Sequence, residues 1–449
     1  MDVLVPHNKK KKYDFVFVCE SKVRELENIC LIAHELEKRG YSTAVVNWWL
    51  RQVRKDYSPV DAKVLMAHAV YKDDSLNREL YYVKGPSHVI NLQWEQVYSR
   101  GEIASETSPW KMAGRVKNVM HLSWGDNNYN KLIEYDGINA DNIRITGSVT
   151  MDTLRPEFTK YYLSREDILP KYNIPIDKKV CLFVSSFSLV NLPEISQEDD
   201  FKELWSLMIK SQKIVLDWMD RLLNERKDIV MVYRPHPAEA DNILIQEMVK
   251  KHDNFFCIGE LSVKQWIVIS DVIYNWYSTS IAEMYFAGKS CHIIRPVPIP
   301  AEIEVITLEN GRYIHNYDEF RDSLDAEDAE FPVPTDKMKS VYSNYGKTPS
   351  YMRVADVCEE VYRSSRLKFK SSIQNNYIKR LYYWLKVTAL GKVLLNIKHM
   401  CDEHKPMTKD RMRANEYEKY VQEMFLKNDF DQNEVDSIMD RICYTLKQV

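Results

Sequence analysis

The sequence predicts an α/β protein with two doubly wound domains that face a crevice and a C-terminal helical appendage. Short apolar runs alternate with helix-length segments through most of the chain, as expected for repeated βα units. A polar, proline-bearing connector interrupts this alternation once. At 449 residues the chain is also longer than one ordinary hydrophobic core.

The first half contains six predicted strands. Apolar residues recur at helical spacing from Leu26 to Leu36 after the first strand, and Gly40 ends that helix. The predicted strands are 14–19, 42–46, 64–66, 88–92, 120–124 and 142–146. These lengths favour a mostly parallel sheet with helices on both faces.

The alternation restarts after a boundary between Arg155 and Lys178. The predicted strands are 180–184, 229–233, 255–258, 272–276 and 292–294, and the predicted helices are 201–223, one after Asp241, 262–269 and one from Ser280. We therefore expect Rossmann-like domains at 1–165 and 175–345, with a helical return segment and a basic, amphipathic appendage at 346–449. Two successive domains of this kind form the GT-B architecture.

Composition and motifs exclude several functional classes. The formal charge of −3 predicts no nucleic-acid partner. The eight cysteines are scattered without zinc spacing, which favours reduced thiols in the cytoplasm. The sequence has no signal-peptide core and no apolar run of membrane-spanning length. It also lacks the glycine patterns of NAD-binding and P-loop proteins, and no pattern indicates a metal or another cofactor.

Two tetrapeptides at predicted strand ends indicate a nucleotide site. Arg234-Pro235-His236-Pro237 follows one strand, and Tyr277-Ser278-Thr279-Ser280 follows another. The carboxyl ends of parallel strands meet at one edge of a sheet, where ligands bind in doubly wound folds. Both segments carry residue types that bind phosphate, so we expect them to border one site.

These segments, together with three others, resemble bacterial GT-B proteins of surface carbohydrate or capsule biosynthesis. The other segments are VCESKVRELENICLIAHELEKRGY, LSWGDNNYNKLIEYDGINADNIRITGSVTMDTLRPEF and the strand end SSFS. The pair RPHP and YSTS also resembles motifs of capsule Kdo transferases, bacterial polysialyltransferases and CDP-glycerol glycerophosphotransferases, which use cytidine nucleotide donors. The resemblance covers about residues 13 to 345 and implies a nucleotide-sugar donor, with a CMP-linked sugar as one option.

Arg234 and His236 suit the leaving phosphate of such a donor. Arg234 offers a planar fork to an anion, and His236 offers a donor or an acid between two prolines. Alternatively, Arg234 pairs with a carboxylate and His236 only packs in a turn. Ser185 and Ser186 follow strand 180–184 and either border the same phosphate or cap a helix.

Ser278, Thr279 and Ser280 lie at a predicted helix start, where free amides attract phosphate. The resemblance implies that Glu283 contacts the nucleotide ribose. The alternative is a capping box, in which Ser280 and Glu283 satisfy backbone amides of the first turn.

The resemblance implies that the nucleotide donor binds domain 175–345 and the acceptor binds domain 1–165. An inverting transfer also needs a general base on the acceptor side. Glu20 follows the first strand and is our first candidate, with Arg24 and Glu25 near enough to orient it. Glu95 and Asp126 follow later strands and are further candidates. Each of Glu20 and Asp126 can alternatively stabilise only a helix N-terminus.

The C-terminal region changes in composition. Every charged residue from Arg363 to Met400 is basic, and aromatic residues are interleaved. This pattern suits peripheral contact of residues 363–400 with an anionic membrane, where a lipid-linked acceptor would lie, or else a solvated helical appendage.

The sequence thus predicts a cytoplasmic glycosyltransferase, at the inner face of the plasma membrane if that contact forms. It would transfer a sugar from a nucleotide-sugar donor to a growing surface polysaccharide or other glycan acceptor. Three alternatives remain: a CDP-alditol polyol-phosphate transferase, a nucleotide-sugar 2-epimerase, and a non-catalytic GT-B-like scaffold of a capsule assembly complex.

Overall fold

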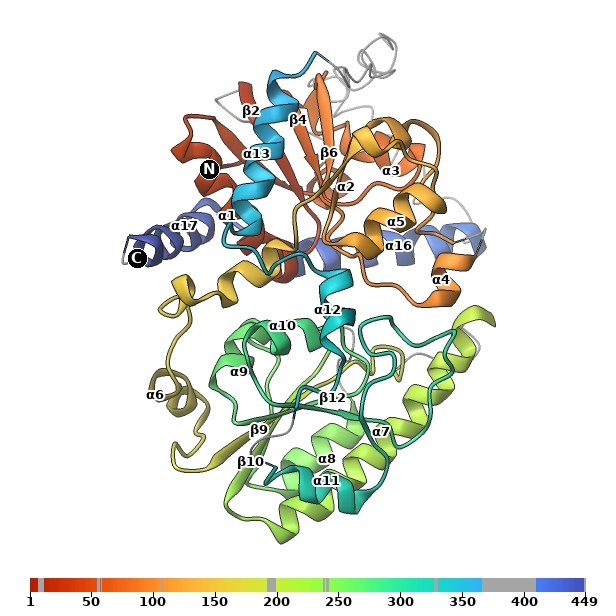
Figure 1. The fold of residues 1–449 in the computed structure, drawn as a ribbon, viewed down its shortest axis with the longest axis vertical. Coiled ribbons are helices and arrows are strands. Elements are labelled where there is room, and N and C mark those ends of the chain that lie inside the picture. The colour runs from red at the N-terminus through yellow and green to blue at the C-terminus, as the bar shows by residue number, and fades with distance from the viewer. Residues whose placement is uncertain are drawn as a thin grey trace. The chain divides into compact units, whose positions relative to one another are not determined.

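The chain forms two compact units, seen in Figure 1. Unit 1 comprises residues 1–96, 109–149 and 346–448, and unit 2 comprises 97–108 and 150–345. The computed structural model describes residues 1–6, 12–54, 57, 59–105, 108–191, 199–236, 239, 242–326, 330–365 and 409–447. The main division thus lies at residue 149 rather than within 165–175, and the described residues after 345 belong to unit 1.

Unit 1 contains one parallel sheet in the order β1-β3-β2-β4-β6-β7-β8, with β5 paired to β4. The strands are β1 (Asp2–Val3), β2 (Lys12–Cys19), β3 (Thr43–Asn47), β4 (Val60–Ala67), β5 (Val83–Lys84), β6 (His88–Asn91), β7 (Met120–Ser123) and β8 (Ile143–Ile145). Residues Phe15 to Cys19 are all at most 1% exposed, so β2 lies at the centre of the core.

Helices cover this sheet. They are the π-helix η1 (Lys22–Leu26), α1 (Glu27–Lys38), α2 (Leu50–Val53), α3 (Asp73–Glu79), α5 (Asp126–Glu134), α13 (Ser350–Arg363), α16 (Lys409–Asn428) and α17 (Gln432–Leu446), with 3₁₀ turns η2 (Gly114–Asn118) and η3 (Ala140–Asn142). Helix α1 packs against both α13 and α17, which lie beside it in Figure 1. The ion pair between Arg39 and Asp356 fixes α13 to the end of α1 at 2.7 Å.

Unit 2 contains a second parallel sheet in the order β11-β10-β9-β12-β13-β14. Its strands are β9 (Lys179–Val184), β10 (Ile229–Arg234), β11 (Phe255–Cys257), β12 (Val272–Asn275), β13 (Cys291–Ile294) and β14 (Tyr313–Ile314). Numbered along the chain, this is the 3-2-1-4-5-6 order of a dinucleotide-binding domain.

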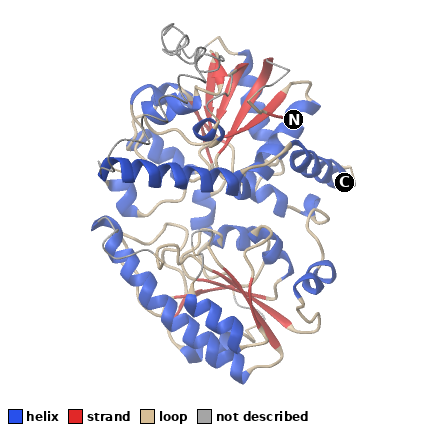
Figure 2. Cartoon of the chain, turned by 180° about the vertical axis from the view of Figure 1, so that it is seen from behind, coloured by secondary structure: helices blue, strands red, loops and turns tan. Residues whose placement is uncertain are grey.

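Helices flank the strands of unit 2, as Figure 2 shows in blue and red. They are α4 (Arg100–Ala104), α6 (Arg165–Ile168), α7 (Asp199–Glu225), α8 (Ile243–Lys251), α9 (Val263–Ile269), α10 (Ile281–Phe286), α11 (Tyr317–Ser323) and α12 (Thr335–Val341), with 3₁₀ turns η4 (Val149–Leu154), η5 (Pro156–Phe158) and η6 (Leu169–Tyr172). The longest, α7, packs against α8, α11 and β10.

The predicted fold class is confirmed: both units are doubly wound α/β sheets, and helices follow in the C-terminal region. Each strand that the sequence predicts from an apolar run is present in the structure. The predictions omitted β1, β5 and β14, which are two residues long and too short for a periodic signal. Gly288 follows α10 with a φ of +63°, the left-handed conformation in which glycine commonly ends a helix.

The basic segment proposed to contact a membrane lies almost wholly outside the described residues, which stop at 365 and resume at 409. Within the described ranges, no helix is both long and apolar enough to cross a membrane.

Candidate functional site

The central strands of unit 1 end at the point where the strand order reverses. The chain runs from β2 to β3 on one side, and then returns to place β4 on the other. Glu20 directly follows β2, and His68 directly follows β4. Because Phe17 is paired with Met66, the register sets His68 opposite Cys19, so Glu20 and His68 leave the same edge of the sheet one residue apart. This is the position at which doubly wound sheets bind ligands.

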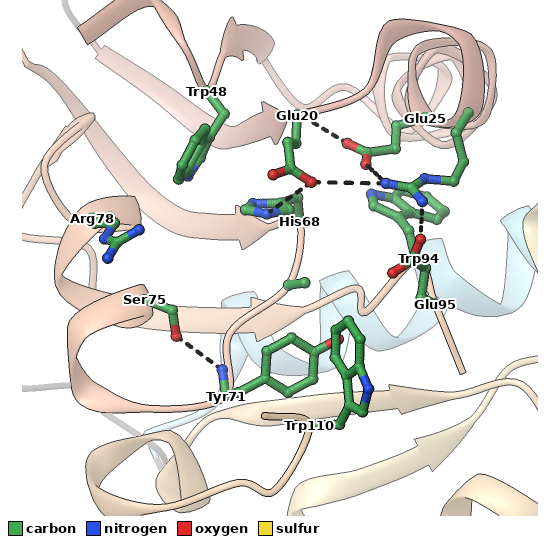
Figure 3. Close-up of a pocket in the computed structure, with 12 residues that line it drawn as sticks. Glu20, Glu25, Trp48, His68, Tyr71, Ser75, Arg78, Trp94, Glu95 and Trp110 are labelled. Atoms are coloured by element: carbon green, nitrogen blue, oxygen red, sulfur yellow. Dashed lines mark hydrogen bonds and ion pairs between the residues drawn. The ribbon is translucent and has the colours of Figure 1, made fainter. Parts of the chain in front are cut away.

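A pocket of about 290 Å³ opens here, entirely within unit 1. Figure 3 shows its side chains. The lining combines charged and aromatic residues from the loops after β2, β3, β4 and β6: Glu20, Arg24, Glu25, Trp48, His68, Ala69, Tyr71, Ser75, Arg78, Trp94, Glu95 and Trp110. This combination suits a polar ligand with flat faces, such as a sugar ring.

The Glu20 carboxylate lies between two cationic groups. One oxygen is 3.7 Å from the Arg24 guanidinium and 3.7 Å from Nε2 of His68. The Glu20 side chain is 31% exposed, so the carboxylate remains accessible from the pocket. Its backbone is also fixed, because its carbonyl accepts a hydrogen bond from Nε1 of Trp49 at 3.0 Å.

Glu25 holds the Glu20 loop from inside the protein. Its carboxylate accepts a 2.7 Å hydrogen bond from the backbone N–H of Glu20 and contacts Arg24 at 3.4 Å. Glu25 is fully buried, and burial raises its pKa to about 7 despite the opposing effects of His68 and Arg24. The π-helical turn makes this contact possible by placing Glu25 beneath the loop, and such turns recur at functional sites.

His68 is oriented by a second buried acid. Its Nδ1 lies 2.5 Å from a carboxylate oxygen of Glu79, which is fully buried in α3. Burial alone lowers the pKa of His68, but Glu79, Glu20 and Glu25 together raise it to about 9. The raised pKa favours the protonated imidazolium, and Nε2 of His68 lies 3.7 Å from the Glu20 carboxylate.

Aromatic side chains form the rest of the wall. Tyr71 and Trp110 lie side by side in Figure 3, with ring centroids 5.3 Å apart. Trp48 packs edge-on against His68 at 5.7 Å. Trp94 is 6% exposed, and its indole N–H has no hydrogen-bond partner among the described residues. The pocket thus offers apolar faces next to its charged groups.

The other two candidate bases, Glu95 and Asp126, differ from Glu20 in where they lie. Glu95 lines the same pocket but is 50% exposed and forms an ion pair with Arg24. Asp126 begins α5 and is not among the lining residues. Of the three acids compared in the sequence, Glu20 and Glu95 therefore line the pocket, and Glu20 is the less exposed of the two, at 31% against 50%.

In unit 2, the candidate phosphate-binding residues follow three neighbouring strands. Val184 of β9 is in register with Arg234 on one side and with Asn275 on the other. Ser185 follows Val184 directly, Arg234 lies level with Val184, and Tyr277 lies two residues beyond Asn275, so all three segments leave the same edge of the sheet. The strand order of this sheet reverses between β9 and β12.

Arg234 is bound only to neutral groups among the described residues. Its guanidinium donates to the carbonyls of Glu260 and Leu261, at 2.7 and 2.5 Å. Burial lowers its pKa to about 10, so it remains charged at neutral pH. No described carboxylate forms an ion pair with it, in contrast to the alternative suggested by the sequence.

His236 is exposed and lies on a turn held by Glu239. The carboxylate of Glu239 accepts from the backbone N–H of His236 at 3.2 Å, and the Glu239 N–H donates to the His236 carbonyl at 2.8 Å. Glu239 is 3% exposed and also accepts hydrogen bonds from Tyr233 and Ser185, each at 2.5 Å. Ser185 is thus part of the support beneath the turn.

The loop after β12 is shaped by a buried asparagine. The side chain of Asn275 donates to the carbonyl of Ser278 and accepts from its N–H, both at 2.7 Å. The hydroxyl of Ser186 accepts from the N–H of Tyr277 at 3.1 Å, which ties this loop to the one after β9. Thr279 is exposed on the same loop.

The capping-box interpretation of Ser280 and Glu283 is wrong. Ser280 precedes α10, but its side chain makes no capping hydrogen bond. Its own N–H donates to the hydroxyl of Ser278 at 3.2 Å, because the tight turn places Ser278 closer than Glu283. Burial raises the pKa of Glu283 to about 7, with Lys264 opposing that rise.

Sequence reasoning missed His68, Glu79, Glu239 and the aromatic wall. His68 was detectable, because it follows a predicted strand directly, as Glu20 does. Glu79 contacts His68, and Glu239 contacts Ser185 and Tyr233, only because the tertiary fold brings them together. No local sequence pattern indicates these contacts. Across the described part of the chain, no group of three or more His, Cys, Asp or Glu side chains is arranged to hold a metal ion.

Comparison with known proteins shows the fold. No family model and no curated sequence matches the chain. A putative UDP-N-acetylglucosamine 2-epimerase from Listeria monocytogenes is similar in structure, with a TM-score of 0.50 and 14% identity, covering 81% of this chain and all of that one. The UDP-GlcNAc 2-epimerase of Methanocaldococcus jannaschii gives a TM-score of 0.49 at 11% identity, covering 78% and 99%.

The wall teichoic acid polymerase TagF gives a TM-score of 0.48 at 15% identity, covering 78% of this chain and 89% of that one. The solved structures in this comparison are GT-B-type enzymes of nucleotide-sugar and related chemistry. The chain accordingly has the two-domain GT-B fold.

Proposed function

We propose that the protein is a GT-B glycosyltransferase, which transfers a sugar from a nucleotide-sugar donor to a hydroxyl of a growing surface polysaccharide or capsule glycan. The observation that carries this proposal is the Glu20 carboxylate, which lies in a pocket between Arg24 and His68 at the carboxyl edge of unit 1. An accessible carboxylate with a fixed backbone has the properties of a general base for a sugar hydroxyl.

Arg234 supports the donor half of the proposal. A half-buried guanidinium that only carbonyls contact among the described residues retains its full charge, and a donor phosphate would supply the missing anion. His236 is exposed on the same turn and would contact the leaving phosphate. Ser278 and Thr279 would add hydroxyl donors, with Glu283 near the nucleotide.

In the proposed reaction, each bond, electron pair and proton is accounted for by the donor, the acceptor and the residues named above. The bond between the sugar carbon and the donor phosphate oxygen breaks, and its electron pair leaves with the phosphate. The acceptor oxygen bonds to that carbon, while its proton passes to Glu20. Arg234 and His236 stabilise the charge that develops on the leaving phosphate.

A nucleotide panel followed by product analysis tests the proposal. CMP, CDP, UMP, UDP, GDP and ADP are screened by thermal shift, since a ligand of the folded state raises its melting temperature. The matching activated sugar or polyol is then incubated with surface-glycan oligosaccharides, and the products are identified by mass spectrometry. We expect an acceptor extended by one sugar.

Other products would replace the proposal. Release of an epimerised sugar without any acceptor would identify a 2-epimerase, and addition of a polyol phosphate would identify a CDP-alditol transferase. No nucleotide shift and no product would favour the scaffold. The His236→Ala variant serves as the site control: we expect it to melt normally and to lose most nucleotide binding or transfer.

A membrane-bound acceptor is a further part of the proposal and rests on the basic sequence from Arg363 to Met400. Cationic residues with interleaved aromatics bind anionic lipid surfaces, and this attraction weakens with salt. Flotation with anionic liposomes at low and moderate salt is the test. We expect co-flotation that weakens with salt, and no flotation at either salt level would remove the membrane from the proposal.

A further inference from the structure

The turn between α16 and α17 contacts the loops that form the unit 1 pocket. Asn428, the last residue of α16, is 5% exposed although it is polar. Its side-chain oxygen accepts a 3.1 Å hydrogen bond from the backbone N–H of Lys22, two residues after Glu20. Its backbone carbonyl accepts a 2.9 Å hydrogen bond from the side chain of Asn47, at the end of β3. One residue therefore bridges two loops of the site.

Further contacts extend this bridge. Lys22 forms an ion pair with Glu434 of α17 at 3.3 Å. The ring of Tyr420 packs edge-on against Trp49, with centroids 6.0 Å apart. Trp49 in turn donates from Nε1 to the carbonyl of Glu20 at 3.0 Å. The C-terminal helices thus contact the backbone near Glu20 in two ways: at Lys22 through Asn428, and at Glu20 itself through Tyr420 and Trp49.

The turn is itself rigidly defined. The Asn428 side chain donates to the carbonyl of Met424 at 2.9 Å, which closes the last turn of α16. Asp431 caps α17 by accepting from the N–H of Glu434 at 2.9 Å. Phe430, between them, is 6% exposed. A capped and anchored turn can hold its hydrogen-bond acceptors in place for the Glu20 loop.

We propose that the α16–α17 turn is a positioning element of the unit 1 site, with Asn428 as its positioning residue. It fixes the start of the η1 turn by binding the Lys22 N–H, and so sets the direction in which Glu20 enters the pocket. The effect of this element on catalysis rests on the proposed function. That Asn428 fixes the loop after β2 rests on its hydrogen bonds to Lys22 and Asn47 and does not depend on the proposed function.

Hydrogen exchange measured by mass spectrometry tests the structural part without any substrate. In Asn428→Ala we expect peptides covering residues 20–26 to exchange at least tenfold faster, while strands β2 and β4 keep their protection. Asn428→Asp retains the acceptor oxygen and should restore slow exchange. Gln432→Ala is the matched control, since the hydrogen bonds of Gln432 among the described residues run to Met1, Val3 and Asp436, away from residues 20–26.

The catalytic part is tested with the donor identified by the nucleotide panel. We expect kcat of Asn428→Ala to fall about tenfold or more with KM for the donor unchanged, because only Glu20 is displaced. Asn428→Asp should recover most of kcat, and Gln432→Ala should match the wild type.

Each failure has its own meaning. Unchanged exchange at 20–26 in a normally folded Asn428→Ala would overturn the proposal outright, and faster exchange with wild-type kcat would overturn the catalytic role. A wild-type protein without transferase activity would refute the proposed function, whereas the exchange result would still decide whether the turn positions the loop.

Discussion

The carboxyl edges of the two sheets carry different chemistry. In unit 1, acids and bases are paired with one another: Glu20 with Arg24 and His68, and His68 with Glu79. In unit 2, Arg234 meets only carbonyls among the described residues. Acids and bases paired in this way suit proton transfer, whereas a cation without a paired carboxylate suits anion binding. Under the proposed function, proton transfer would fall to unit 1 and binding of the donor phosphate to unit 2.

The largest expected effect tests the acid–base character of unit 1. Glu20→Gln removes the proposed base but keeps the shape of the side chain. We expect kcat to fall by about 10²- to 10⁴-fold. Glu95→Gln is the matched control, because Glu95 lines the same pocket and pairs with Arg24 but is 50% exposed. Equal losses in both variants, measured by steady-state kinetics, would remove the distinction between these acids.

The second prediction tests the uncompensated cation of unit 2. Arg234→Gln should weaken nucleotide binding by about 1.5–3 kcal/mol, the usual contribution of a hydrogen bond to a charged group. Calorimetric titration measures this change. Arg226→Gln is the control, because Arg226 precedes the same strand and already pairs with Asp228 and Asp325. Nucleotide affinity that survives Arg234→Gln would show that the cation does not meet the phosphate.

Most strands of both sheets, and the loops that follow them, were predictable from the sequence. Apolar runs placed β2, β9, β10 and β12 correctly, and the rule that ligands bind at carboxyl ends then located Glu20 and Arg234. The partners of these residues could not be predicted. The contact from Asn428 to Lys22 spans 406 positions, and such contacts leave no periodic trace in one sequence.

The third prediction concerns pH and the buried groups of unit 1. The folded-state pKa of Glu25 lies near 7, above its ordinary value of 4.5, and that of His68 lies near 9, above 6.5. The stability contributed by Glu25 is therefore complete below about pH 4.5 and is lost as the pH rises through 7. The contribution of His68 is complete below about pH 6.5 and is lost as the pH rises through 9.

Denaturation at a series of pH values checks these windows. Relative to wild type, Glu25→Gln should gain stability as the pH rises from 4.5 to 7, and His68→Gln from 6.5 to 9. We expect changes on the order of 1 kcal/mol per pH unit. Difference curves that stay flat across both windows would show that these groups titrate normally.

The smallest expected effect tests the helix starts of unit 2. Ser262 caps α9 by accepting from the N–H of Gln265 at 3.2 Å, whereas Ser280 forms no such bond. Ser262→Ala should lower the free energy of unfolding by about 1 kcal/mol, and Ser280→Ala by less than about 0.5 kcal/mol. Thermal melts measure both changes. A loss of about 1 kcal/mol in Ser280→Ala would show that Ser280 does cap α10.

Calorimetric titration of the selected nucleotide into wild type, Glu20→Gln and Arg234→Gln tests the separation of tasks most directly. The account predicts equal binding by wild type and Glu20→Gln, and at least tenfold weaker binding by Arg234→Gln. Binding that is lost in Glu20→Gln and retained in Arg234→Gln would contradict it, as would a wild-type protein that binds none of the six nucleotides.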